Sequence, residues 1–189
     1  MGRFSSLPTA LITDDSALGG SIIEKSLRFN DGDSPELVRT FGTNTSNTTK
    51  TFSCWMKRGT IGTAQNIMST QVSGYIEGRL RINSDDTLQF EDRDASGGTS
   101  DGRRQTTAKL RDTTNWYHIM LVLDSTQANE ADRAKIYING EQVTAFAATR
   151  SISQNYAFSF NRSSANNYIG NLSGSSEFFD GYLAEINFI

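Results

Sequence analysis

Residues 116–124, with the sequence WYHIMLVLD, constrain the fold more than any other stretch of this chain. In an extended strand, successive side chains point to opposite faces. Here both sets of alternate residues are largely apolar. That pattern is typical of a strand covered on both sides, so we expect it at the centre of a sheet.

The next stretch, residues 134–143, keeps the same period of two. Ile136 and Ile138 fall on one face, and Lys135 and Tyr137 on the other. Asn139-Gly140 then supplies a two-residue turn, because both central positions of a type I′ turn need the positive φ that Asn and Gly tolerate best. The two stretches together predict a buried strand, a loop and a tight hairpin.

The composition favours an all-β domain. Among 189 residues, Phe (11) and Tyr (6) are plentiful, Gly (16) is frequent and Pro (2) is rare. Long helical patterns rich in Ala, Leu, Glu and Lys are absent from the sequence. This composition suits a sandwich with many polar turns better than a helical bundle.

Further strands are expected wherever apolar residues alternate between turn signals. Residues 75–83 and 87–91 predict a hairpin with one face in water, and residues 92–105 are the most loop-like stretch. In the last strand, Tyr182, Ile186 and Phe188 are expected on one face together with Ala184. The other expected strands are 26–29, 36–40, 50–58, 66–71, 106–110, 156–160 and 167–172. The whole pattern predicts a two-sheet antiparallel β-sandwich of jelly-roll type.

Residues 1–25 lack this strand period, so we interpret them as an N-terminal arm preceding a jelly-roll domain at 26–189. The arm carries apolar residues that something must cover, either the domain or a partner. Its candidate anchoring or oligomerisation residues are Phe4, Leu7, Leu11 and Ile12.

Charge and apolar content limit the partners. The net charge is −3 and no basic stripe occurs, so nucleic-acid binding is not expected. No apolar run approaches the roughly 18 residues of a membrane-spanning helix, so membrane insertion is not expected either. The single cysteine, Cys54, alternates with Phe52 and Met56 and is interpreted as a buried apolar side chain.

Several pieces of the sequence occur in an order that resembles a known family. These are SLRFN from residue 26, TFSCWMKRG from 51, WYHIMLVLD, KIYINGEQV, YIGN from 168 and FFDGYLAEINFI from 178. Residues 26–189 resemble the concanavalin A-like lectin/glucanase superfamily, and within it laminin-G-like jelly rolls. The combination of SLRFN, the WMKRG strand and LAEINFI is similar to modules of bacteriophage virion proteins, including tail fibres. The resemblance implies two curved sheets, glycan binding as one function of the fold and, in some relatives, a calcium ion in the rim loops.

Catalytic groups of this superfamily are not found in the sequence. A retaining glucanase needs two carboxylates about 5–5.5 Å apart. Glu91, Asp92 and Asp94 come nearest to that pattern, but Glu91 and Asp92 point to opposite faces of a strand. His118, the only histidine, lies among apolar neighbours and is interpreted as structural rather than catalytic or zinc-binding. We therefore predict a non-enzymatic protein.

Ligand candidates come from the expected rim loops. Aromatic faces and arginine forks suit sugars, and hard oxygen ligands suit calcium. The expected carbohydrate-binding residues are Tyr75, Asp92, Asp94, Arg103 and Arg104, and the expected calcium ligands are Asp31 and Asp33. No cofactor is required, and calcium is left open.

The sequence favours a structural module of a phage virion, such as a tail-fibre or surface-appendage component attached by its N-terminal arm. Its partners would be other virion proteins and copies of itself, with a trimer as the state the resemblance implies. Two alternatives stay open: a lectin module that binds host surface polysaccharide, and a glycan hydrolase.

Overall fold

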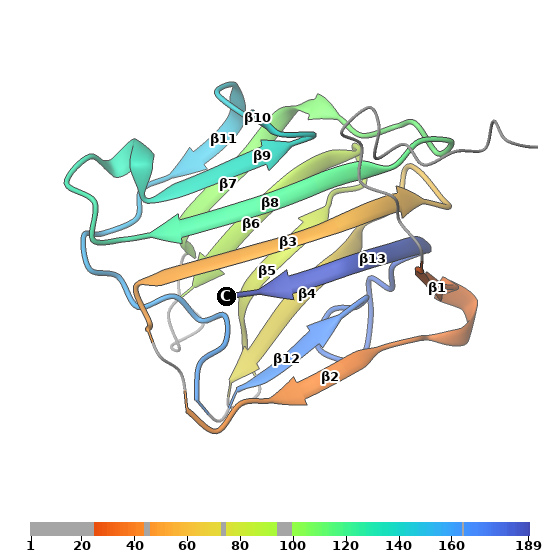
Figure 1. The fold of residues 1–189 in the computed structure, drawn as a ribbon, viewed down its shortest axis with the longest axis horizontal. Coiled ribbons are helices and arrows are strands. Elements are labelled where there is room, and N and C mark those ends of the chain that lie inside the picture. Colours follow the sequence, from red (N-terminus) through yellow and green to blue (C-terminus); the bar gives the residue numbers. More distant parts are fainter. Residues whose placement is uncertain (1–24, 44–45, 73–74, 94–99, 164) are drawn as a thin grey trace, which may run out of the picture.

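The computed structural model describes residues 25–43, 46–72, 75–93, 100–163 and 165–189. The expected arm residues Phe4, Leu7, Leu11 and Ile12 and the expected loop residue Asp94 lie outside this part of the chain. The described residues form two antiparallel sheets packed face to face, as predicted (Figure 1). Within these ranges no helix is long and apolar enough to cross a membrane.

The first sheet has six strands in the order β1-β13-β3-β8-β9-β10. Every neighbouring pair in this sheet is antiparallel, and the sheet forms the near layer in Figure 1. The bounds of its strands are β1 Leu27–Phe29, β3 Thr49–Arg58, β8 Tyr117–Asp124, β9 Ala134–Ile138, β10 Glu141–Gln142 and β13 Gly181–Phe188.

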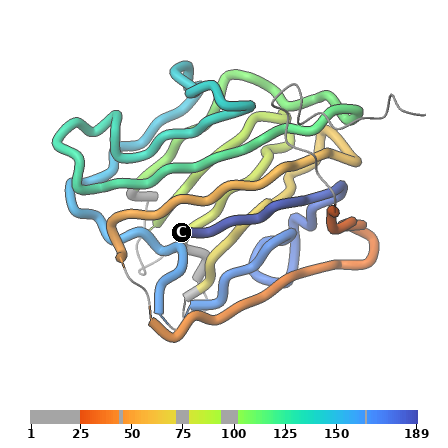
Figure 2. Tube along the Cα trace, in the orientation of Figure 1, coloured from red at the N-terminus to blue at the C-terminus, as the bar shows by residue number. Residues whose placement is uncertain are grey.

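The second sheet has seven strands in the order β11-β7-β6-β5-β4-β12-β2. The chain changes sheet early, because β1 leads through the short 3-10 helix Asp31–Asp33 to β2 at the lower edge of Figure 2. The bounds of its strands are β2 Leu37–Thr40, β4 Gln65–Val72, β5 Tyr75–Ile82, β6 Thr87–Arg93, β7 Ser100–Lys109, β11 Phe146–Arg150 and β12 Asn166–Ile169. A second 3-10 helix, Glu130–Asp132, precedes β9.

The core fills the space between the two sheets. Phe52, Cys54 and Met56 of β3 point into it and are at most 2% exposed, as their alternation predicts. Leu80 of β5 and Phe90 of β6 meet them from the seven-stranded sheet. Cys54 is 0% exposed, which confirms its interpretation as a buried apolar side chain, and this burial raises the pKa of its thiol to about 12.

The expected turn at Asn139-Gly140 is present. Asn139 has φ 53° and Gly140 φ 82°, and Ile138 pairs directly with Glu141. The central strand β8 is covered less completely than predicted. Its inward residue Leu121 is 2% exposed, whereas Met120 on the outward face is half-buried because no third layer covers that face among the described residues.

Three further expectations about the strands are wrong. Residues 100–109, expected mostly as loop, form strand β7, whose polar side chains hide the usual apolar alternation. Tyr156, Phe158 and Phe160 alternate but pair with no strand in the described part of the chain. Phe158 and Phe160 instead fill one end of the core. The outward face of the β5–β6 hairpin is polar but not wet, because Gln89 and Glu91 are only 3% and 1% exposed.

The last strand changes face partway along its length. A bulge between Ala184 and Asn187 places one extra residue opposite β3. Leu183 pairs with Met56 above the bulge, and Phe188 pairs with Phe52 below it. Phe188 therefore points toward the core and Tyr182 points outward, so the predicted common face of these two residues is wrong.

Candidate functional site

The structure separates the residues that the sequence predicted as one carbohydrate site. Arg103 points outward from β7, whereas Arg104 and Asp92 point inward and are 3% and 0% exposed. Tyr75 begins β5, and nothing is described of its side chain. Arg103, Arg104 and Asp92 are strand residues, so their expected place in rim loops is wrong.

The buried Arg104 side chain makes hydrogen bonds inside the protein. Its guanidinium donates to the Glu130 carboxylate at 2.6 Å and to the Arg150 carbonyl at 2.9 Å. These contacts connect β7 with the 3-10 helix before β9 and with the edge strand β11. An arginine buried in this way is not available to an external ligand.

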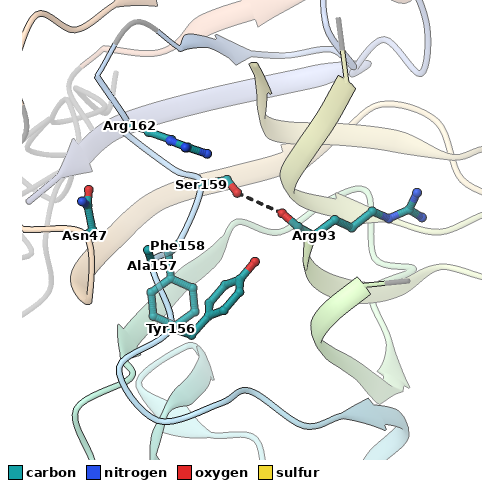
Figure 3. Close-up of a pocket in the computed structure, with 7 residues that line it drawn as sticks. All are labelled: Asn47, Arg93, Tyr156, Ala157, Phe158, Ser159 and Arg162. Atoms are coloured by element: carbon teal, nitrogen blue, oxygen red, sulfur yellow. Dashed lines mark hydrogen bonds between the residues drawn. The ribbon is translucent and has the colours of Figure 1, made fainter. Parts of the chain in front are cut away.

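Asp92 is also occupied. Its carboxylate accepts hydrogen bonds from the Tyr156 hydroxyl at 2.9 Å and from the Ser159 amide and hydroxyl at 3.1 and 2.8 Å. A cavity of about 360 Å³ lies beside this network, with Tyr156, Ser159 and Arg162 in its wall (Figure 3). The Ser159 hydroxyl also donates to the Arg93 carbonyl, while the Arg93 side chain extends away from Ser159 (Figure 3). Asp92 therefore connects β6 with residues 156–159 at one end of the sandwich.

The expected calcium ligands lie in the 3-10 helix after β1. Asp31 and Asp33 are both exposed, and Asp33 accepts a hydrogen bond from the Asn30 side-chain amide at 2.7 Å. No group of three or more acidic, histidine or cysteine side chains that could hold a metal occurs within the described ranges. The two aspartates alone do not form a calcium shell, which takes six to eight oxygens.

A different polar cluster covers the outward side of the seven-stranded sheet. We call it the arginine face and define it by Arg79, Arg81, Glu91, Arg93 and Arg103. Antiparallel pairing of β5 with β6 and of β6 with β7 places Arg79, Glu91 and Arg103 in one cross-strand row. The neighbouring row contains Arg81, Gln89 and Gln105.

Glu91 organises this face. One of its carboxylate oxygens accepts from Arg79 through Nε at 2.9 Å and Nη2 at 2.6 Å, and the other accepts from Arg103 at 2.6 Å. Arg93 lies 3.4 Å from the second oxygen. Burial by itself raises the pKa of Glu91, but the hydrogen bond from Arg103 and the charge of Arg79 lower it to about 2. Glu91 is therefore ionised at neutral pH and holds three arginines in place.

The arginine face keeps donors that the protein does not use. Glu91 neutralises one of the three positive charges around it, and the Nη1 groups of Arg79 and Arg103 make no hydrogen bond among the described residues. Arg81 is paired with Glu177 at 3.3 Å, and burial lowers the Arg81 pKa. A polar depression of about 340 Å³ beside Arg81 is lined by Asn83, Gln89 and Gln105. Arginine forks beside side-chain amides suit carboxylates and hydroxyls.

The sequence pointed to only one of these arginines. Arg79 and Arg81 alternate on the polar face of the predicted hairpin, which was the available signal. Their convergence with Arg103 depends on β7 being a strand, and that strand was not predicted in full. Glu91 and Asp92 do lie on opposite faces of β6, as expected.

Known proteins that are similar to this chain share its two-sheet fold. The family model described as "Concanavalin A-like lectin/glucanases superfamily" matches residues 30–189. A search of curated proteins found no match.

Solved structures with the same fold include domains LG4-5 of the mouse laminin α1 chain, with TM-score 0.62 and 11% identity over 89% of this chain and 42% of that one. The heptameric SAP-like pentraxin of Limulus polyphemus has TM-score 0.51 and 14% identity over 89% and 77% of the two chains. The CBM40 of a Ruminococcus gnavus IT-sialidase, bound to α2,3 sialyllactose, has TM-score 0.55 and 16% identity over 76% of each. The family match covers more than half of the sequence and agrees with the two-sheet fold, so this chain belongs to the concanavalin A-like lectin/glucanase superfamily.

Proposed function

We propose that this chain is a non-catalytic carbohydrate-binding module that recognises acidic glycans through the arginine face. The observation that carries this proposal is the row formed by Arg79, Glu91 and Arg103, in which one buried carboxylate positions two arginines whose Nη1 groups stay unused among the described residues. Arginine forks bind carboxylates, such as those of acidic sugars, through two parallel charge-assisted hydrogen bonds. The side-chain oxygen of the neighbouring, half-buried Gln105, which accepts no hydrogen bond among the described residues, suits a hydroxyl of the same sugar.

The comparison with the sialidase CBM40 supports the ligand class, since that protein is bound to sialyllactose, an acidic glycan. Support for a non-catalytic role comes from β6, where Glu91 and Asp92 point to opposite sides of the sheet and cannot share a substrate. Each carboxylate is also held by its own set of hydrogen bonds.

The test is a binding measurement with the purified chain. Isothermal titration with 3′-sialyllactose and with an oligogalacturonate should detect binding, and lactose should bind at least tenfold more weakly at this face. Arg103→Gln should weaken acidic-glycan binding about tenfold or more, because it removes a charge-assisted donor. Arg39→Gln, on the exposed edge strand β2, removes the same charge elsewhere and should change nothing.

Two outcomes would contradict the proposal. One is a folded chain that binds neither acidic probe, with calcium or with a chelator present. The other is acidic-glycan binding that Arg103→Gln leaves unchanged. Incubation with the same oligosaccharides should release no reducing sugar, and measurable release would overturn the non-catalytic assignment.

We further propose the biological setting as a surface appendage of a bacteriophage virion that attaches to host polysaccharide. Its support is the order of the pieces SLRFN, WMKRG and LAEINFI along the chain, which is similar to phage appendage modules. On this proposal the chain assembles as a trimer through residues 1–25. Light scattering of the whole chain tests the trimer, and a particle-binding assay with the whole chain and a 1–25 deletion variant tests the arm. A monomeric whole chain, or a deletion variant that docks on particles as well as the whole chain does, would contradict the proposal.

A further inference from the structure

The outward face of the six-stranded sheet carries a second constellation, remote from the arginine face. Strands β13, β3 and β8 lie side by side (Figure 1), and their pairing places Ala184, Trp55 and His118 in one cross-strand row. Asn139, at the start of the hairpin turn, continues that row and accepts a hydrogen bond from the His118 amide at 2.8 Å. The row crosses three adjacent strands and ends at a turn.

A cavity of about 540 Å³ opens on this face. We call it the tryptophan pocket and define it by Trp55, Trp116, His118, Asn139 and Glu185. The rings of Trp55 and His118 lie 5.0 Å apart at an angle of 50°. The Trp116 ring is held edge-on by Tyr182, with centroids 6.4 Å apart. The volume falls in the range of small-molecule sites, about 300–1,000 Å³.

The β-bulge in β13 delivers Glu185 to this pocket. Ala184 points outward opposite Trp55, so regular alternation would turn the next residue toward the core, opposite Cys54. Glu185 instead adopts a φ of 46°, stays exposed and contributes to the wall of the pocket. Bulges of this kind re-aim single side chains, and positive φ at a residue other than glycine is retained where the surroundings hold it.

The polar groups around the pocket are not used by the protein. Within the described ranges, neither indole N–H, neither ring nitrogen of His118, nor the Glu185 carboxylate makes a hydrogen bond or ion pair. The side-chain amide nitrogen of Asn139 likewise has no partner there, because the contact with His118 uses the oxygen. Donors and acceptors therefore surround two half-buried indole rings.

We propose that the tryptophan pocket binds an uncharged pyranose ring of a glycan. The apolar C–H face of such a sugar stacks on an aromatic ring. The Glu185 carboxylate accepts hydrogen bonds from sugar hydroxyls, and the Asn139 amide donates to them. The same carboxylate repels acidic sugars, so this pocket and the arginine face select different residues of a mixed polysaccharide. The inference is independent of the proposed arginine-face site, because the two lie on opposite sheets.

The experiment uses the whole chain and exploits its two tryptophans, which both lie in this pocket and are the only ones present. Methyl glycosides of glucose, galactose, mannose and N-acetylglucosamine are titrated while indole fluorescence and the indole N–H resonances are recorded. At least one glycoside should shift both signals saturably.

Variants locate the binding. Trp116→Ala should weaken the affinity for that glycoside at least tenfold. Glu185→Gly removes the carboxylate while suiting the positive φ, so it keeps the fold and should also weaken binding tenfold. Arg103→Gln, on the other sheet, should leave neutral-glycoside binding unchanged.

Three results would overturn the proposal. The first is a folded chain whose indole signals respond to no neutral glycoside up to about 50 mM. Any binding free energy would then be weaker than about −2 kcal/mol. The second is a response that Glu185→Gly leaves unchanged. The third is saturable binding of tetramethylammonium in place of the sugars, which would identify the pocket as an aromatic cage for cations. Loss of acidic-glycan binding alone would affect only the arginine face.

Discussion

At the scale of single residues, the charge of Glu91 is the feature on which the arginine face depends. Its side chain is 1% exposed and sits against Arg79, Arg93 and Arg103. A carboxylate with this many partners stabilises the fold only while it is ionised, because protonation leaves the arginines facing one another. Stability and the geometry of the candidate site therefore depend on the same proton.

We predict that Glu91→Gln destabilises the protein at pH 7 by on the order of 3 kcal/mol, the scale set by a pKa lowered from 4.5 to about 2. Since the folded-state pKa is depressed, this contribution is fully present above pH 4.5 and is lost as the pH falls toward 2. Urea denaturation of both proteins at pH 7, 4 and 2.5 should show the difference shrinking with acid. Glu141→Gln, on the exposed strand β10, is the control. A difference between wild type and Glu91→Gln that stays constant with pH would contradict the assignment.

At the scale of elements, the turn after β9 was predictable and the last strand was not. Asn139-Gly140 has a two-residue signature because few residues tolerate positive φ, so the local sequence alone selects the turn. The bulge in β13 has no such signature: the alternation of Tyr182, Ala184, Ile186 and Phe188 reads the same with or without one extra residue. Only the packing of Phe188 against Phe52 reveals the shift.

The first part of strand β7, residues 100–105, escaped prediction for a related reason. Its outward side chains, such as Arg103, belong to the polar face, and its inward Arg104 is neutralised by Glu130. Apolar alternation, the main strand signal, is therefore missing on both sides. The arginine face could be predicted only in part, because its members come from three strands and the part of β7 that carries Arg103 was interpreted as a loop.

The hairpin turn offers a matched test of backbone conformation. Gly140 and Gly42 both have open space where a Cβ would be placed, but only Gly140 has positive φ, at 82°. Gly140→Ala should therefore destabilise the protein by about 1–2 kcal/mol, while Gly42→Ala should be neutral or slightly stabilising. Thermal and urea unfolding of the two variants make the comparison. Equal effects of the two changes would show that the left-handed conformation at Gly140 is not required.

At the scale of the whole molecule, a cluster of buried charged residues lies at each end of the sandwich. At one end Asp92 of the seven-stranded sheet accepts from Tyr156 and Ser159, near the buried Lys50 of β3. Burial lowers the pKa of Lys50, and the nearby charge of Asp92 opposes that shift. At the other end Arg58 of β3 donates to Asp86 at 2.9 Å and to the Leu110 carbonyl at 2.6 Å, which joins the two sheets. The apolar core thus lies between two buried polar clusters, one around Asp92 and one around Arg58.

Substitution of Arg58 should have the largest effect on stability that we expect. Asp86 also accepts from the Gly62 amide and from Arg111, and these bonds, working against the burial that raises its pKa, lower that pKa to about 2. Arg58→Met leaves this buried carboxylate short of a partner and should cost about 3–5 kcal/mol of unfolding free energy.

Lys57→Met, the neighbouring half-buried residue on the outward face of β3, should change stability by less than about 1 kcal/mol. The double variant Arg58→Met with Asp86→Asn should recover part of the loss, because it removes the stranded charge as well as its partner. Urea denaturation followed by circular dichroism measures all four proteins. If Arg58→Met unfolds at the same urea concentration as wild type, the contacts of Arg58 with Asp86 and Leu110 do not hold the two sheets together. The apolar core alone would then hold them.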